Sequence, residues 1–318
     1  MLPPSVADWL TSHTSAMADW QAADLRARSD RPSIAVVLPA LNEAATVGTI
    51  VTAIREAHIG VGGLVSEVVV IDSGSTDATA EVAAGAGARV VSKDDVLTGI
   101  PVAAGKGEAM WRGVAATSAE LVVFVDADLQ SFTPDYITAL VGPLLTDDRI
   151  QLVKAIYERP LVAGDHVVPA GGGRVTELVA RPLLNQFWPE LTGVVQPLAG
   201  EYAARRTLLE SLPFPTGYGV EFALMVDTYE RFGLGALAQV DLGVRVHRHH
   251  NDQGLGVMAA EILATATHRT PGGNAGGSGS GSGNPTSLTQ FERTGDGYLP
   301  HERPLATAER PPLRTLEG

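Results

Sequence analysis

Residues 121–128 read Leu-Val-Val-Phe-Val-Asp-Ala-Asp, and this stretch decides the fold. Its first five residues are all apolar, which is typical of a strand buried on both faces in a parallel sheet. Asp126 and Asp128 follow directly, at the end of the strand where an open α/β sheet binds its ligands. Two carboxylates in this position suit a hard divalent cation bound to a diphosphate. The alternative is a pair of aspartates that caps the next helix or turn.

Further segments on both sides of this stretch read as the other strands. They lie at residues 34–38, 68–71, 89–91, 151–156 and 238–242. Val47, Ile50, Val51 and Ile54 have the spacing of one face of a helix. We expect further helices over residues 79–86, 105–117, 174–186, 220–232 and 255–267. Strands that alternate with helices predict an α/β protein, with a mainly parallel sheet and helices on both of its faces.

Composition excludes several classes of protein. The chain has 318 residues, with 23 basic and 36 acidic side chains, so its formal net charge is −13. The apolar fraction of 45% excludes a disordered chain, and the acidic balance argues against a nucleic-acid partner. The absence of cysteine excludes disulfides, thiolate catalysis and cysteine-ligated zinc. No secretory signal opens the sequence and no run approaches about 20 apolar residues, so we expect a cytoplasmic protein without a membrane partner.

Four regions follow from the distribution of these patterns. We expect a helical arm in residues 1–30, a nucleotide-binding half in 31–150, a second half in 151–268 and a flexible Gly/Ser linker with a tail in 269–318. The tail carries proline and charge, and we expect it to be weakly ordered or to lie across a partner subunit. Apolar residues in the arm and the tail, such as Trp9, Trp20 and Phe291, favour a homodimer.

Two other predicted strands also end in polar segments. Pro39-Ala-Leu-Asn-Glu43 follows the first strand, and Asp72-Ser-Gly-Ser-Thr-Asp77 follows the second. Each segment alone reads as a turn or a helix cap. Together with the aspartates at 126 and 128 they line one edge of the sheet, where a nucleoside would lie. No Gly-x-Gly-x-x-Gly follows the first strand, which argues against a dinucleotide-dependent dehydrogenase.

Two glycine-rich segments are candidate anion sites. Lys106 stands between Gly105 and Gly107, so that the backbone can approach a phosphate closely; a surface lysine in a loop is the alternative. The segment Gly171-Gly-Gly-Arg-Val-Thr176 combines glycines, an arginine and the amide groups of a helix start. We favour an anion site here over a simple turn, because the threonine hydroxyl falls in the same first turn.

The second half supplies three further candidates. Residues 245–250 read Arg-Val-His-Arg-His-His after a strand, which places Arg245, His247 and His249 on one face. A neutral His247 can complete a carboxylate metal site, although histidines also cluster in exposed polar loops. Glu221 opens a helix after Tyr218 and Gly219. A carboxylate is favoured there by the helix dipole, and it could also bind sugar hydroxyls or stabilise positive charge on an anomeric carbon.

Pro-x-x-Asn-Glu, Asp-x-x-Ser-x-Asp and Asp-x-Asp at successive strand ends resemble the GT-A (Rossmann-like) fold of nucleotide-sugar glycosyltransferases. The similarity to actinobacterial glucosyl-3-phosphoglycerate synthases is closer still. It rests on these motifs together with Ala-Gly-Lys-Gly-Glu at 104–108, Gly-Gly-Gly-Arg-Val-Thr-Glu at 171–177, Gln-Pro-Leu-Ala-Gly-Glu-Tyr at 196–202, Tyr-Gly-Val-Glu at 218–221 and Arg-x-His at 245–247. The resemblance runs from about residue 34 to residue 268, which is most of the predicted folded chain.

This resemblance implies a metal-dependent retaining transfer of glucose from UDP-glucose to 3-phosphoglycerate, with Mg²⁺ or Mn²⁺ as cofactor and a smaller acceptor-binding half in residues 151–268. The donor site would comprise Pro39, Ala40, Leu41, Glu43, Ser73, Lys106, Asp126, Ala127, Leu198, Glu221 and Arg245. Gly173, Arg174, Thr176 and His249 would bind the acceptor, and Asp128 and His247 would ligate the metal. The catalytic set would be Glu221, Lys106 and Asp128. A mannosyl-3-phosphoglycerate synthase that uses GDP-mannose, and a non-catalytic nucleotide-sugar-binding protein, are the alternatives.

Overall fold

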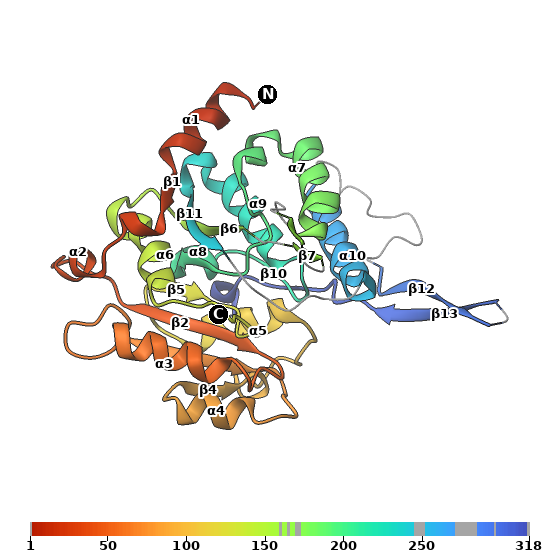
Figure 1. The fold of residues 1–318 in the computed structure, drawn as a ribbon, viewed down its shortest axis with the longest axis horizontal. Helices are drawn as coiled ribbons and strands as arrows, with labels where there is room; N and C mark the ends of the chain where they lie inside the picture. The colour runs from red at the N-terminus through yellow and green to blue at the C-terminus, as the bar shows by residue number, and fades with distance from the viewer. Residues whose placement is uncertain are drawn as a thin grey trace.

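A computed structural model describes residues 2–158, 161–163, 166–168, 173–244, 252–270, 285–295 and 297–316. An eight-stranded sheet runs through it in the order β1-β11-β6-β9-β5-β2-β3-β4 (Figure 1). The bounds of its strands are β1 (Thr14–Ala16), β2 (Ile34–Ala40), β3 (Glu67–Asp72), β4 (Arg89–Ser92), β5 (Leu121–Phe124), β6 (Leu152–Glu158), β9 (Tyr202–Arg205) and β11 (Leu237–Val244).

The sheet is mainly parallel, as the alternating pattern predicts. Only β9 runs antiparallel to its neighbours β5 and β6 within this sheet as described. The predicted strands became β2, β3, β4, β5, β6 and β11, and β5 ends one residue before the expected position. The sequence did not reveal β9, whose four residues include two alanines and two polar-tipped side chains. The expected boundary near residue 150 falls just before β6, within this one sheet.

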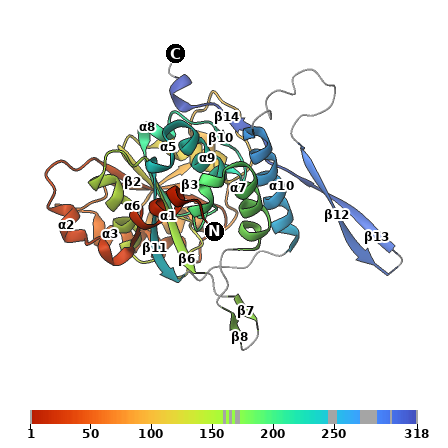
Figure 2. The same ribbon diagram turned by 90° about the horizontal axis from the view of Figure 1, so that it is seen from above.

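Helices cover both faces of the sheet, because alternate strand residues point to opposite sides. Val36 packs with one core and Val37 with the other. The first core lies under α3 (Val47–His58), α4 (Thr79–Gly85) and α6 (Asp135–Thr146). The second lies under α5 (Lys106–Ala116), α7 (Arg181–Phe187), α9 (Val220–Phe232) and α10 (Asp252–Arg269), as Figure 2 shows from above. Within the described ranges no helix is long and apolar enough to cross a bilayer.

The N-terminal arm is only partly helical. It contains α1 (Pro4–Ser12) and α2 (Ala22–Arg26), as expected, but β1 between them adds an edge strand to the sheet. Trp9 anchors this arm, because its indole nitrogen donates a hydrogen bond to the carbonyl of Leu237 at 3.0 Å. In the same region, the backbone amide of Gln239 donates a hydrogen bond to the backbone carbonyl of His13 at 2.8 Å. The arm therefore packs on its own chain.

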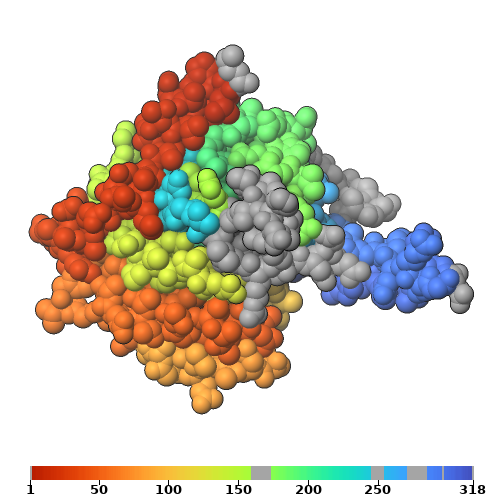
Figure 3. Space-filling view, viewed as in Figure 1, coloured from red at the N-terminus to blue at the C-terminus, as the bar shows by residue number. Residues whose placement is uncertain are grey.

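The tail is ordered over most of its length, which corrects the expectation of weak order. The strands β12 (Ser287–Thr294) and β13 (Gly297–Pro304) form an antiparallel hairpin that extends away from the body (Figures 1 and 3). After it, β14 (Glu309–Arg310) pairs with β10 (Phe214–Pro215) of the same chain. Another short hairpin joins β7 (Leu161–Ala163) to β8 (His166–Val168). Residues 271–284, the expected linker, lie outside the described ranges.

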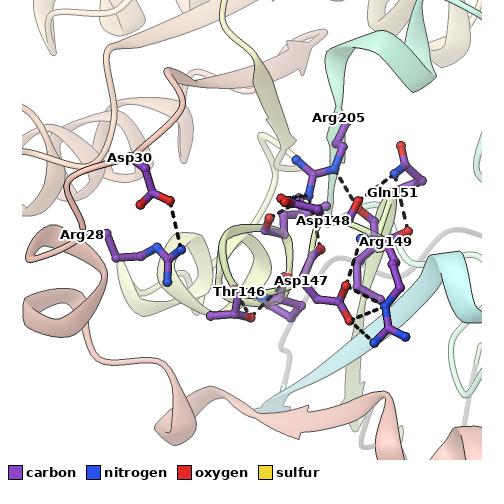
Figure 4. Close-up of polar contacts among 12 residues, drawn as sticks. Arg28, Asp30, Thr146, Asp147, Asp148, Arg149, Gln151 and Arg205 are labelled. Carbon is purple, nitrogen blue, oxygen red and sulfur yellow. Dashed lines mark hydrogen bonds and ion pairs between the residues drawn. The ribbon is translucent and has the colours of Figure 1, made fainter.

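A polar cluster lies at the end of the sheet opposite to the Asp-Ala-Asp segment (Figure 4). Arg205 donates to the carbonyl oxygens of Leu144 and Ile150, both at 2.9 Å. Arg149 forms an ion pair with Asp147 at 2.7 Å beside them. Since β6 begins at Leu152, these contacts mark the amino end of the parallel strands. Ligands of such sheets bind at the opposite edge.

Candidate active site

Hydrogen bonds join the loops after β2 and β3 at the carboxyl edge of the sheet. Pro39 and Ala40 end β2, and the amide of Ser73 donates to the carbonyl of Ala40 at 2.9 Å. Asn42 adopts a left-handed conformation with φ of 59°, and its side-chain oxygen accepts from the amide of Thr76 at 2.8 Å. Asparagine tolerates this conformation better than most residues. The predicted nucleoside motifs are thus locked to each other.

Two further predicted residues lie in the loop after β2. Leu41 is 54% exposed, an unusual position for a leucine that offers apolar surface to a ligand. The backbone amide of Glu43 donates to Thr79 Oγ1 at 2.7 Å, which ties this loop to the first turn of α4. The loop therefore has a fixed backbone and an exposed apolar side chain.

The Asp-Ala-Asp segment follows β5 at the same edge. Thr46 Oγ1 donates to the carbonyl of Ala127 at 2.6 Å, which fixes the segment to the residue before α3. Gly200 lies directly behind Asp126, since a Cβ atom at position 200 would collide with that carboxylate. The turn that contains Gly200 also contains Leu198, which is half-buried. The Asp-Ala-Asp segment therefore packs against the loop that contains Gly200, two residues after Leu198.

An ion-pair cluster joins three predicted residues from three different elements. Lys106 Nζ lies 2.6 Å from Asp126 Oδ1 and 2.7 Å from Glu221 Oε1. Exposure of these side chains is low, at 21% for Lys106, 19% for Asp126 and 6% for Glu221. Burial by itself lowers the pKa of Lys106, but the two carboxylates outweigh it and raise that pKa well above its usual value. Lys106 is therefore a permanent cation at neutral pH.

The starts of α5 and α9 pack tightly against each other, which explains the glycines around Lys106. Gly105 has a φ of 112°, and a Cβ atom there would collide with the carbonyl of Thr216. A Cβ atom on Gly107 would collide with the carbonyl of Pro215. The sequence suggested that these glycines let the backbone approach a phosphate. The structure gives them another role, in the close packing of the two loops.

Lys154 is a cation beside this cluster that sequence reasoning missed. It lies within β6, is 2% exposed, and donates to the carbonyl of Ala199 at 2.8 Å. Its ammonium group lies 5.1 Å from the centre of the Tyr202 ring. Burial lowers the pKa of Lys154 to about 8, although the charge of Glu221 opposes this shift. The available signal was a single lysine inside the segment Leu152–Ile156, whose other four residues are apolar.

The predicted acceptor residues lie on another element. Gly173 and Arg174 precede a π-helical turn, η3 (Thr176–Ala180), which continues into α7. Thr176 is buried and Arg174 is exposed. π-Helical turns are rare and are frequently found at functional sites. Arg245, His247 and His249 lie outside the described residues. In the described part of the chain, no group of three or more His, Asp or Glu side chains forms a ready-made metal site.

Comparisons with known proteins show which family the chain belongs to. The model of glycosyl transferase family 2 matches residues 35–166, which include the first two strand ends and the Asp-Ala-Asp segment. The glucosyl-3-phosphoglycerate synthase of Mycolicibacterium smegmatis is 48% identical over 308 residues, which cover 97% of this chain and 98% of that protein. The synthase of Mycobacterium tuberculosis strain H37Rv is 49% identical over 303 residues, with 93% and 90% covered.

Solved structures of the Mycobacterium tuberculosis synthase have the same fold. Its complex with Mn²⁺, UDP and glucosyl-3-phosphoglycerate superposes with a TM-score of 0.81 at 47% identity, and covers 93% of this chain and 96% of that one. Its complex with Mn²⁺ and UDP-glucose gives a TM-score of 0.80 at 48% identity, with 93% and 95% covered. Similarity at this level over nearly the whole length is not limited to the nucleotide-binding half. The chain therefore belongs to the glucosyl-3-phosphoglycerate synthase family.

Proposed function

We propose that the chain transfers glucose from UDP-glucose to 3-phosphoglycerate to give glucosyl-3-phosphoglycerate. The observation that carries this proposal is the ion-pair cluster of Lys106, Asp126 and Glu221 at the carboxyl edge of the sheet. The Lys106 ammonium group is already removed from water and held between two carboxylates. It can therefore bind the diphosphate of an incoming donor without a further cost of desolvation. Family membership supports the same reaction, because the relatives are named for it.

The donor would lie across the loops at this edge. Uridine would contact Pro39, Ala40, Leu41, Glu43 and Ser73, with Asp126 and Ala127 near the ribose. Lys106 would bind the diphosphate, and its charge would stabilise the negative charge that develops when the glycosidic bond breaks. Leu198 and Glu221 would line the glucose site, and Arg245 would complete the donor site.

A divalent cation fits the residues at this edge. Asp128 offers a half-buried carboxylate at the strand end, and hard oxygen ligands of this kind suit Mg²⁺ and Mn²⁺. We propose that Asp128 and His247 hold the ion. When bound, the ion would supply positive charge against the diphosphate leaving group. Complexes of the Mycobacterium tuberculosis synthase with Mn²⁺ or Mg²⁺ together with UDP support a divalent cofactor.

The acceptor hydroxyl would approach the reacting carbon from the same face as the leaving diphosphate, as retention by direct displacement requires. Gly173, Arg174, Thr176 and His249 would hold its phosphate and carboxylate, since an exposed guanidinium at a helix start is suited to anions. We propose transfer with retention by front-face displacement, in which a donor phosphate oxygen takes the acceptor proton. Glu221 is held in an ion pair with Lys106, which supports a role in binding glucose rather than as a nucleophile.

A comparison of two sugar donors in separate reactions tests this function. Purified protein, Mg²⁺ and 3-phosphoglycerate are mixed with UDP-glucose or GDP-mannose, and the product is identified by mass. A hexosyl phosphoglycerate from UDP-glucose, and none from GDP-mannose, is the expected result. A product from GDP-mannose alone would establish mannosyl transfer. Binding of UDP-glucose without any product would favour a non-catalytic binding protein.

We also propose that the protein is a homodimer and is located in the cytoplasm, where phosphorylated substrates are available. The hairpin of β12 and β13 supports the dimer, because Phe291, Tyr298 and Leu299 are 65%, 71% and 50% exposed on it. Exposed apolar side chains on a projecting element are typical of an interface. Light scattering should give a mass of two chains, and the triple substitution of these residues by serine should reduce it to one. Cell fractionation tests the location.

A further inference from the structure

We propose that residues 305–313, here called the C-terminal strap, position Lys106 and Glu221 for catalysis, with Arg310 as the principal positioning residue. The strap follows the hairpin and lies against the starts of α5 and α9. None of its residues belongs to the donor or acceptor set above. The inference rests on the proposed function, because it concerns the same site.

The first contact of the strap is with α5. Arg310 Nε lies 2.5 Å from Glu108 Oε2, and a second guanidinium nitrogen donates to Glu108 Oε1 at 2.9 Å. Glu108 is fully buried and stands two residues after Lys106. Arg112 also donates to Glu108 Oε1, at 2.7 Å. Bidentate pairs of this kind fix direction as well as distance, so Arg310 orients the first turn of α5.

The surroundings of Arg310 hold it in one place. Its guanidinium donates to the carbonyl of Pro101 at 2.5 Å and lies 5.4 Å from the centre of the Trp111 ring. The indole nitrogen of Trp111 donates to the carbonyl of the next strap residue, Pro311, at 3.0 Å. Burial opposes the charged form of Glu108, but the hydrogen bonds from Arg310 and Arg112 hold its pKa below the usual value. The carboxylate therefore stays ionised and paired.

The second contact is with the turn that opens α9. The amide of Thr216 donates to the carbonyl of Ala308 in the strap at 2.8 Å. Glu261 of α10 joins the two segments, since one carboxylate oxygen accepts from the amide of Ala306 at 2.7 Å and the other from the amide of Tyr218 at 2.8 Å. Tyr218 stands three residues before Glu221. The strap thus fixes the turn from which the Glu221 helix begins.

These two contacts converge on one geometry. The amide of Glu108 donates to the carbonyl of Thr216 at 3.0 Å, so the two loops that the strap holds also hold each other. The result is the 2.7 Å approach of Lys106 to Glu221. The strap lies far outside residues 35–166, the part of the chain that the family 2 model matches. It supplies a constraint on the donor site from the other end of the chain.

The test compares Arg310→Ala and Arg310→Lys with a matched control, Arg314→Ala. Arg314 is exposed and lies four residues further along, so its removal changes net charge equally. We expect Arg310→Ala to reduce kcat/KM for UDP-glucose by roughly 10- to 100-fold, since small misplacements of catalytic groups have effects of this size. The KM for 3-phosphoglycerate should stay within about twofold of the parent value. Arg310→Lys should recover part of the loss, and Arg314→Ala should match the parent.

A second readout separates positioning from folding and from the proposed reaction. The affinity for UDP with Mg²⁺ is measured by calorimetry for each folded variant. It should fall most in Arg310→Ala, less in Arg310→Lys, and not in Arg314→Ala. If Arg310→Ala does not fold, Glu108→Gln removes the same charge pair and is measured instead. Equal UDP affinity and equal UDP-glucose kinetics in the parent and in Arg310→Ala would overturn the inference. A parent protein that binds UDP but transfers no glucose would refute the proposed function, and the UDP affinities would still decide the role of the strap.

Discussion

Lys106 Nζ lies 2.7 Å from Glu221 Oε1 and so joins the first turns of α5 and α9 across the carboxyl edge of the sheet. The ammonium is shared with Asp126 at 2.6 Å. The residue proposed to bind the diphosphate is therefore held by the residues proposed to contact ribose and glucose. Donor binding would redistribute these charges rather than introduce a new cation. This relationship underlies the first two predictions.

Substitution of Lys106 by methionine should remove the cation and leave its apolar stem. We expect kcat/KM for UDP-glucose to fall by roughly 100- to 1,000-fold, because one preorganised electrostatic contact to a leaving group has about this effect. Steady-state kinetics with saturating 3-phosphoglycerate measures it. Arg149→Met, in the polar cluster at the opposite end of the sheet (Figure 4), is the control and should be unchanged. Kinetics equal to those of the parent in Lys106→Met would show that Lys106 does not bind the diphosphate.

Glu221→Gln distinguishes two routes to retention. Glutamine keeps the size of the side chain and its capacity to bind sugar hydroxyls, but it cannot act as a nucleophile. We expect kcat to fall by about 10- to 100-fold, as for loss of a charged contact. Turnover is followed together with mass spectrometry of the protein during reaction. Complete loss of turnover, with a glucosylated parent enzyme detected at Glu221, would instead establish a covalent route.

Gly107→Ala should disturb both the fold and the site. The added methyl group would collide with the carbonyl of Pro215, which is backbone and cannot rotate away. Overpacking of this kind costs about 1–3 kcal/mol of folding free energy. Denaturant unfolding measures it, and kinetics should show a loss of activity as Lys106 moves. Gly235→Ala is the matched control, because nothing lies within 4 Å of a Cβ atom there; equal stability of the two variants would contradict the packing argument.

Lys154 should make stability depend on pH in alkaline solution. Its folded-state pKa is about 8, below the usual lysine value of 10.5, so the unfolded chain binds more protons between these values. Stability should therefore rise with pH across this window as the buried ammonium loses its proton. Relative to Lys154→Met, the parent should gain about 2 kcal/mol between about pH 7 and about pH 9.5. Unfolding in urea at both pH values tests this, and a constant difference would show that the lysine does not titrate there.

Much of the fold could be predicted from local patterns. Residues 34–38 and 121–125 are apolar on both faces, and their burial in parallel strands follows directly. The N-terminal arm differed from the expected helix because three of its residues pair with the edge of β11. This contact is set by tertiary packing and not by the pattern of those residues. β9 differed for a similar reason, since Tyr202–Arg205 is short and has no apolar run.

The candidate site was predicted in part, and its unpredicted members share one property. Asp126, Lys106 and Glu221 stand in recognisable motifs, and the structure brings them together. Lys154 and Arg310 are held by hydrogen bonds to residues distant in the sequence. Lys154 bonds to Ala199, 45 residues away, and Arg310 bonds to Glu108, 202 residues away. Contacts of that separation leave no local signal. The pairing of β14 with β10 was not predicted for the same reason, because these two strands are distant in the sequence.

Glucosyl transfer to 3-phosphoglycerate is tested by following the product itself. The protein is incubated with Mg²⁺, UDP-glucose and 3-phosphoglycerate, and the anomeric proton of the product is observed by nuclear magnetic resonance. We predict an α-linked glucosyl phosphoglycerate, which accumulates only when both substrates are present. A β-linked product would contradict retention, and release of free glucose or no turnover with intact, UDP-binding protein would contradict the proposed transfer to 3-phosphoglycerate.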